Sequence, residues 1–202
     1  MSVTINASTS SGLVQSADTS GALALQSNGT TKLTVDSTGA YGQLVSGTAV
    51  ASTSGTSIDF TSIPSWVKRI TVMFNGVSTN GSADILIQLG NSGGIENTGY
   101  AGTATRAADT SNARAALSAG VNINSGGGAA AASNNGQCVF SLLNSATNLW
   151  AFTGLNSNTN INQATTFAGT KALSAVLDRV RVTATNGTDT FDAGTLNILY
   201  EG

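Results

Sequence analysis

The chain has 202 residues, of which 40% are hydrophobic and only 9% are charged, with a formal net charge of −2 and no histidine. This length fits one main folded core with an additional arm. A weakly acidic chain lacks the basic surface that phosphate binding requires, so no nucleic-acid partner is expected.

The N-terminus begins Met1-Ser2-Val3-Thr4-Ile5 and lacks the charged and apolar regions of a signal peptide. No apolar run in the chain approaches the roughly 20 residues that span a bilayer. We therefore expect no membrane partner, and we expect the product to be assembled inside the cell that makes it.

Residues 1–45 are predicted to form a separate arm that contains a β-hairpin. Two short apolar segments, residues 22–26 and 32–36, flank Asn28-Gly29, a preferred hairpin turn. An isolated hairpin is only marginally stable in water. Its apolar side chains therefore need a partner surface, for docking or for contact between copies: they are Leu23, Leu25, Leu33 and Val35.

Residues 46–202 are predicted to form the main β domain. Segments 69–74 and 84–89 are the clearest strands, and Asn80-Gly81 between them predicts a hairpin. The glycine-rich region 91–136 is expected to form long loops, with a short helix over residues 107–117. Further strands are expected at residues 58–60, 138–143, 149–153, 172–177, 179–184 and 195–200.

About eight short strands separated by glycine and asparagine turns are typical of a sandwich, a barrel or a jelly roll. We therefore expect an all-β protein, a jelly-roll-like β-sandwich with an N-terminal β-hairpin arm. Trp66, two residues after the only proline, is expected to be an apolar anchor.

The absence of histidine excludes Ser-His-Asp and Cys-His catalysis. The single cysteine, Cys138, lies in an apolar run and is predicted to be buried, and a lone thiol cannot build a zinc site. No phosphate-binding or dinucleotide-binding glycine pattern follows a predicted strand. We predict no catalytic residues, no cofactor and no metal site.

Paired carboxylates remain chemically able to hydrolyse glycosides without histidine, and Asp189 with Asp192 offers oxygen ligands to a hard cation. Turn formation explains these residues equally well. We expect solvated or turn-forming roles for all the candidate carboxylates, which are Asp59, Asp84, Glu96, Asp178, Asp189, Asp192 and Glu201.

A sugar-binding reading depends on aromatic rings in loops, for which Tyr100 and Trp150 are the candidates. Trp150 lies in the apolar run Leu149-Trp150-Ala151-Phe152 and is expected in the core. The position of Tyr100 stays open.

Three parts of the sequence resemble fibre and virion appendage proteins of tailed phages. They are the phrase from Gly21 to Asp36, the stretch from Gly55 to Gly90 with Ile63-Pro64-Ser65-Trp66-Val67-Lys68 at its centre, and the ending from Phe191 to Gly202. With the opening Val3-Thr4-Ile5-Asn6, they cover about half of the chain. The resemblance implies a homotrimer with an attaching N-terminal arm and an outward-facing β domain.

The resemblance further implies a non-enzymatic structural protein on the surface of the phage particle, assembled in the host cytoplasm. Two positions fit: a capsid decoration or cement protein on the major capsid protein, or a short fibre component bound to tail or fibre proteins. The chain is short for a receptor-reaching tail fibre and shows no repetitive shaft, which brings the capsid position level with the fibre position. The alternative is a sugar-binding adhesin or a receptor-binding tip protein that contacts a host surface glycan.

Overall fold

The computed structural model describes residues 23–36, 39–41, 44–108, 112–130 and 132–202. All regular structure in this described part is β-strand, which confirms the expected all-β class. The chain divides into two compact units, Met1–Gln43 and Leu44–Gly202. The first holds the N-terminal hairpin, and the second is a two-sheet sandwich.

The N-terminal unit contains a three-stranded antiparallel sheet. β1 (Leu23–Ser27) and β2 (Thr30–Asp36) form the expected hairpin, and β3 (Gly39–Tyr41) adds to β2. Asn28 and Gly29 form the turn with φ values of 50° and 72°. Two consecutive positive φ values define a type I′ turn, which asparagine and glycine tolerate best.

The sandwich begins with β4 (Leu44–Ser46), which pairs with the C-terminal strand β17 (Phe191–Glu201). The expected boundary between residues 45 and 46 cuts through this strand, so the sandwich starts at residue 44. The residues that follow β4 are mostly small, and they lie at an edge of the sheet, where β5 (Val50–Ala51) also pairs with β17. Composition could not reveal this, because the pairing partner lies at the other end of the chain.

Eight strands of the sandwich pair in the pattern of one long antiparallel hairpin that is folded over on itself. The first strand pairs with the eighth, the second with the seventh, the third with the sixth and the fourth with the fifth. These pairs are β4 with β17, β6 (Ser57–Phe60) with β16 (Leu177–Ala184), β7 (Arg69–Thr79) with β13 (Asn134–Asn144), and β8 (Ile85–Asn91) with β12 (Val121–Asn122).

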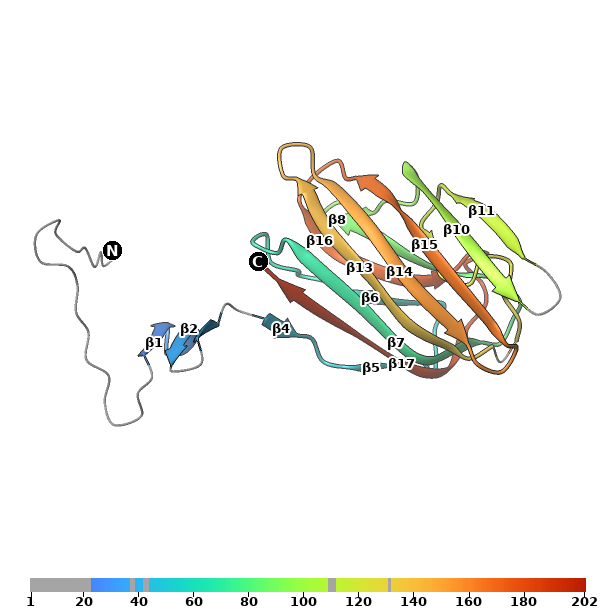
Figure 1. Cartoon of the computed structure of the whole chain (residues 1–202), viewed down its shortest axis with the longest axis horizontal. Helices are drawn as coiled ribbons and strands as arrows, with labels where there is room; N and C mark the ends of the chain where they lie inside the picture. Colours follow the sequence, from blue (N-terminus) through green and yellow to red (C-terminus); the bar gives the residue numbers. More distant parts are fainter. Residues whose placement is uncertain (1–22, 37–38, 42–43, 109–111, 131) are drawn as a thin grey trace, which may run out of the picture. The chain divides into compact units, whose positions relative to one another are not determined.

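Two further pairings, β7 with β17 and β8 with β16, join these ribbons into two sheets. The resulting orders, β4-β17-β7-β13 and β6-β16-β8-β12, form a jelly roll, the double Greek-key sandwich. Figure 1 shows the two layers.

Two inserted strand pairs widen the first sheet beyond β13. They are β14 (Leu149–Asn158) with β15 (Gln163–Ala172), and β10 (Tyr100–Ala108) with β11 (Ala113–Leu117). The large sheet thus has nine strands, counting β5, and the small sheet has five, counting β9 (Gly94–Ile95).

The predicted helix over residues 107–117 and the long loops over 91–136 are wrong. β10 pairs with β15 along its whole length, and residues 102–106 of β10 also pair with β11. Alanine favours helices in isolation, but pairing with a neighbouring strand overrides this weak preference. Residues 109–111, between the two strands, lie outside the described residues.

The predicted hairpin of residues 69–74 and 84–89 is also wrong, although both strands exist. β7 belongs to the large sheet and β8 to the small one, so Asn80-Gly81 carries the chain from one layer to the other. The strand predicted over residues 172–177 is also wrong, because β15 ends at Ala172, β16 begins at Leu177, and residues 173–176 connect them. Local turn chemistry is the same for a hairpin and for an inter-sheet connection.

The core lies between the two sheets and is filled by alternating residues of their strands. Phe152 and Phe167 lie opposite glycines of neighbouring strands, in the pairs Phe152 with Gly169 and Phe167 with Gly154. A Cβ on Gly169 would lie 2.6 Å from Cζ of Phe152. Because these glycines have no side chain, the two phenylalanine rings can lie over them. Aromatic residues often cover strand glycines in this way.

Candidate functional site

The apolar residues predicted in the hairpin lie on one face of the N-terminal sheet. Leu23 is directly opposite Val35, and Leu25 is opposite Leu33, so both pairs share a face. Leu25 and Val35 remain 43% and 38% exposed. The structure thus brings together all four predicted contact residues, and leaves two of them half open to solvent.

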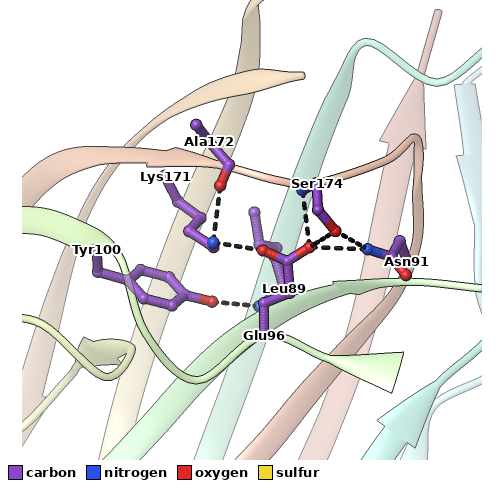
Figure 2. Close-up of polar contacts among 7 residues, drawn as sticks. All are labelled: Leu89, Asn91, Glu96, Tyr100, Lys171, Ala172 and Ser174. Carbon is purple, nitrogen blue, oxygen red and sulfur yellow. Dashed lines mark hydrogen bonds and ion pairs between the residues drawn. The ribbon is translucent and has the colours of Figure 1, made fainter. Parts of the chain in front are cut away.

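A cluster of polar side chains lies in the sandwich, between the ends of β8, β10 and β15 (Figure 2). Glu96 follows β9, Asn91 ends β8, and Tyr100 begins β10. Lys171 lies near the end of β15, and Ser174 lies in the connection to β16. The cluster is the one place in the described sandwich where a carboxylate meets a buried lysine.

The Glu96 carboxylate accepts hydrogen bonds on both oxygens. The Lys171 ammonium donates to Oε2 at 2.5 Å, while Asn91 Nδ2 at 2.7 Å and the Ser174 backbone and hydroxyl, each at 2.8 Å, donate to Oε1. Lys171 also donates to the carbonyl of Ala172 at 2.7 Å and lies 5.6 Å from the centre of the Tyr100 ring. Its charge is thus compensated although the residue is only 4% exposed.

Burial alone would raise the pKa of Glu96, but the hydrogen bonds from Lys171 and Ser174 together hold it below its ordinary value. Burial raises the pKa of the Tyr100 phenol, whose oxygen accepts a 2.6 Å hydrogen bond from the Leu89 backbone. Glu96 is therefore held as a carboxylate and Tyr100 as a neutral phenol.

This arrangement connects the two sheets. Glu96 and Asn91 belong to the small-sheet side, whereas Lys171 lies in the large sheet. The oxygens of Glu96 are occupied by donors from the protein itself. The geometry indicates a non-covalent link between the two sheets. Glu96, which was expected to be solvated, is instead bound by Lys171 and Ser174.

Sequence reasoning missed Lys171 and Ser174. One signal was available for Lys171: it has the same strand parity as Phe167, which places a charge on the core-facing side of β15. A lysine in that position requires a buried partner.

The opposite end of the sandwich is rich in asparagine and aspartate side chains that cap backbone groups. Asp189 accepts hydrogen bonds from the Asn186 amide at 2.6 Å and the Ala83 backbone at 2.9 Å, which hold its pKa below the ordinary value. Asp192 accepts a 2.6 Å bond from the Ser78 hydroxyl. Across the described ranges, no three potential metal-ligating residues cluster.

The remaining candidate side chains are mostly buried. Trp150 is 2% exposed and Cys138 is fully buried, which confirms both predictions, and Tyr100 is 5% exposed. Trp66 is partly exposed and packs against Tyr200, with ring centres 6.0 Å apart. Tyr100 and Trp150 therefore present no open ring on which a sugar could stack.

No helix in the described part of the chain is long and apolar enough to cross a membrane. Comparison with protein-family models, with curated proteins and with solved structures finds no match to this chain.

Proposed function

We propose that this chain is a non-enzymatic structural protein of a tailed-phage virion, a surface-exposed homotrimer that serves as a capsid decoration or cement protein or as a short fibre component. In this proposal the N-terminal hairpin attaches the protein to the major capsid protein or to a tail or fibre protein. The sandwich faces outward from the particle.

The apolar face of the hairpin carries the proposal. A sheet of three short strands cannot cover both of its own faces, and isolated small sheets are marginally stable. Leu25 and Val35, 43% and 38% exposed, form a compact apolar surface with Leu23 and Leu33. Apolar patches of this kind mark interaction sites.

The sandwich supports the same reading through the roles of its polar groups. The Glu96 carboxylate binds Lys171 and Ser174, and Asp189 caps a backbone amide. These contacts hold the fold together, as expected of a structural protein. The sugar-binding alternative loses its two candidate ring platforms, because Tyr100 and Trp150 are buried.

The first experiment combines mass measurement in solution with electron microscopy of particles that carry the protein. We expect three chains per molecule and density over the capsid lattice, or at the tail if the protein is a fibre component. A monomer that is absent from particles would contradict the proposal.

A charged substitution then tests the hairpin as the attachment site. We expect the double variant Leu25→Asp/Val35→Asp to be lost from particles. Ala24→Asp is the matched control, because Ala24 alternates to the other face of β1. If the double variant is incorporated into particles as well as the wild type, the hairpin is not the attachment site.

A further inference from the structure

The outer face of the large sheet carries no charge over four neighbouring strands. In β10, β15, β14 and β13, outward positions alternate with core positions. The outward positions hold only alanine, serine, threonine, asparagine, glutamine, valine and leucine. We call this surface the neutral face.

The small sheet differs on its outer side, where Arg181 binds both oxygens of Asp59 at 2.7 Å. Charges also border the neutral face. Arg114 in β11 lies opposite Thr105, and Arg69 in β7 lies opposite Ser141 and pairs with Glu201 at 3.1 Å. Depletion of charge at the centre with charged residues at the rim is one compositional feature of protein–protein interfaces.

The neutral face also has a projection and a hollow side by side. Leu155 in β14 is 51% exposed. An open hollow of about 270 Å³ lies next to it, lined by Thr103 and Thr105 of β10, Thr166 and Ala168 of β15, and Thr153 of β14. Leu155 and the hollow are neighbours, because Leu155 pairs directly with Thr166.

We infer that copies of this chain associate through the neutral face, with Leu155 of each copy seated in the hollow of the next copy around a closed ring. This inference rests on the proposed homotrimer and names the surface that builds it. With the rotation of 120° per copy that a homotrimer requires, the projection of each copy meets the hollow of the next in a heterologous contact, and the ring closes.

The absence of charge favours a second copy over another partner. In such a ring the same face supplies both sides of the contact, so each charge on it would need an opposite charge elsewhere on that face or would be buried unpaired. Alanine, serine and threonine also lose little side-chain entropy on contact. An electrostatically complementary foreign partner would instead be expected to select charges on this face.

Cross-linking between introduced cysteines tests the inference in the full chain. In the variant Leu155→Cys/Thr105→Cys, both cysteines lie opposite Thr166 on its two sides, so two strand spacings, about 9.6 Å, separate them within one chain. This exceeds the roughly 7 Å limit for a disulfide. The native Cys138 is buried, so any bond between the new thiols must join two copies.

We expect mild oxidation to convert this variant into a covalent trimer, three times the 20.1 kDa chain mass, on a non-reducing gel. Leu143→Cys/Thr105→Cys is the matched control and should stay monomeric on the gel, because Leu143 is 65% exposed but lies near the end of β13, six residues beyond Gln137, the partner of Leu155. Leu155→Asp should lower the solution mass from three chains to one while the circular dichroism spectrum is unchanged.

The outcomes separate this inference from the proposed function. The protein could be a trimer that does not cross-link through these cysteines and does not dissociate with Leu155→Asp. That result overturns the inference that copies associate through the neutral face. It leaves the virion proposal intact, with the hairpin as the contact between copies. Covalent dimers from Leu155→Cys alone overturn the ring arrangement. If the wild-type protein is a monomer at every concentration, both the association through the neutral face and the proposed homotrimer are overturned.

Discussion

Single residues set the spacing between strands in the widened part of the large sheet. Gly169 allows the Phe152 ring and the β10 backbone to approach, since an added Cβ would lie 2.6 Å from Cζ of Phe152 and 2.5 Å from the Ala101 carbonyl oxygen. A backbone oxygen cannot move aside as the end of a flexible side chain can. Glycine at this position is therefore a packing requirement.

We predict that Gly169→Ala lowers the free energy of unfolding by about 1–3 kcal/mol, the usual cost of overpacking a core. Ala164→Ser in the same strand is the control, because Ala164 faces solvent and surface changes usually stay within about 0.5 kcal/mol. Urea denaturation of both variants measures the difference. Equal midpoints would contradict the close packing at Gly169.

The ion pair of Glu96 and Lys171 is a second residue-scale constraint. We predict that Glu96→Gln lowers the free energy of unfolding by about 3–5 kcal/mol, because it leaves Lys171 buried without a counter-charge. The double variant Glu96→Gln/Lys171→Met removes both charges and should recover most of the loss. Denaturant midpoints measured at neutral pH compare the two variants.

The same pair makes stability depend on pH. Because the pKa of Glu96 is lowered on folding from its ordinary 4.5, its contribution is fully present above pH 4.5 and is lost as the pH falls through the lower folded-state value. We predict that Glu96→Gln reduces the stability difference between pH 7 and pH 3. An identical pH dependence in wild type and variant would show that other carboxylates cause it.

At the scale of elements, β4 and β5 protect the edge that β17 would otherwise expose. The connection after β4 donates a 2.7 Å backbone hydrogen bond from Gly47 to Ile198, and the buried Ser52 hydroxyl donates a 2.8 Å bond to the Ala193 carbonyl. An unprotected edge strand promotes pairing with other chains. These short strands therefore contribute both stability and solubility.

We predict that removing residues 1–43 leaves the melting temperature of the sandwich within about 2 °C of its value in the full chain. Removing residues 1–51 should lower it by about 5–10 °C, since several hydrogen bonds of about 1 kcal/mol are lost and each 1 kcal/mol corresponds to about 2–4 °C at this size. Calorimetry of the two truncated chains measures the difference. Equal melting temperatures would mean that β4 and β5 contribute nothing to the sandwich.

At the scale of the whole molecule, Cys138 reports on the integrity of the entire sandwich. It lies in β13 between β7 and β14, is fully buried, and has a pKa raised by burial. A neutral, inaccessible thiol is unreactive. Reaching it requires the large sheet to separate from the small one or to open between its strands.

We predict that a thiol reagent modifies native Cys138 only at the rate of global unfolding, so that urea accelerates modification in step with the loss of structure. The thiol introduced by Val176→Cys, at a position that is 55% exposed in the connection between β15 and β16, should react at once and serves as the control. Fast modification of Cys138 in the native protein would reveal local opening of β13.

The sequence by itself determined the features that depend on neighbours along the chain. Alternating apolar residues around Asn28-Gly29 specify a hairpin with Leu23 and Leu25 on one face, because strand alternation and turn geometry are local. The short apolar runs that contain Cys138 and Trp150 correctly assigned both residues to the core. The all-β class follows from many such short segments.

Only the tertiary structure decided which strands are neighbours and which charges meet. Asn80-Gly81 is compatible with a hairpin or with a crossing between sheets, and the partners of β7 come from distant parts of the chain. The Glu96–Lys171 pair and the neutral face likewise arise from residues far apart in sequence. The physical reason is that pairing energy depends on how all the strands together bury apolar surface and satisfy backbone hydrogen bonds, which no local segment encodes.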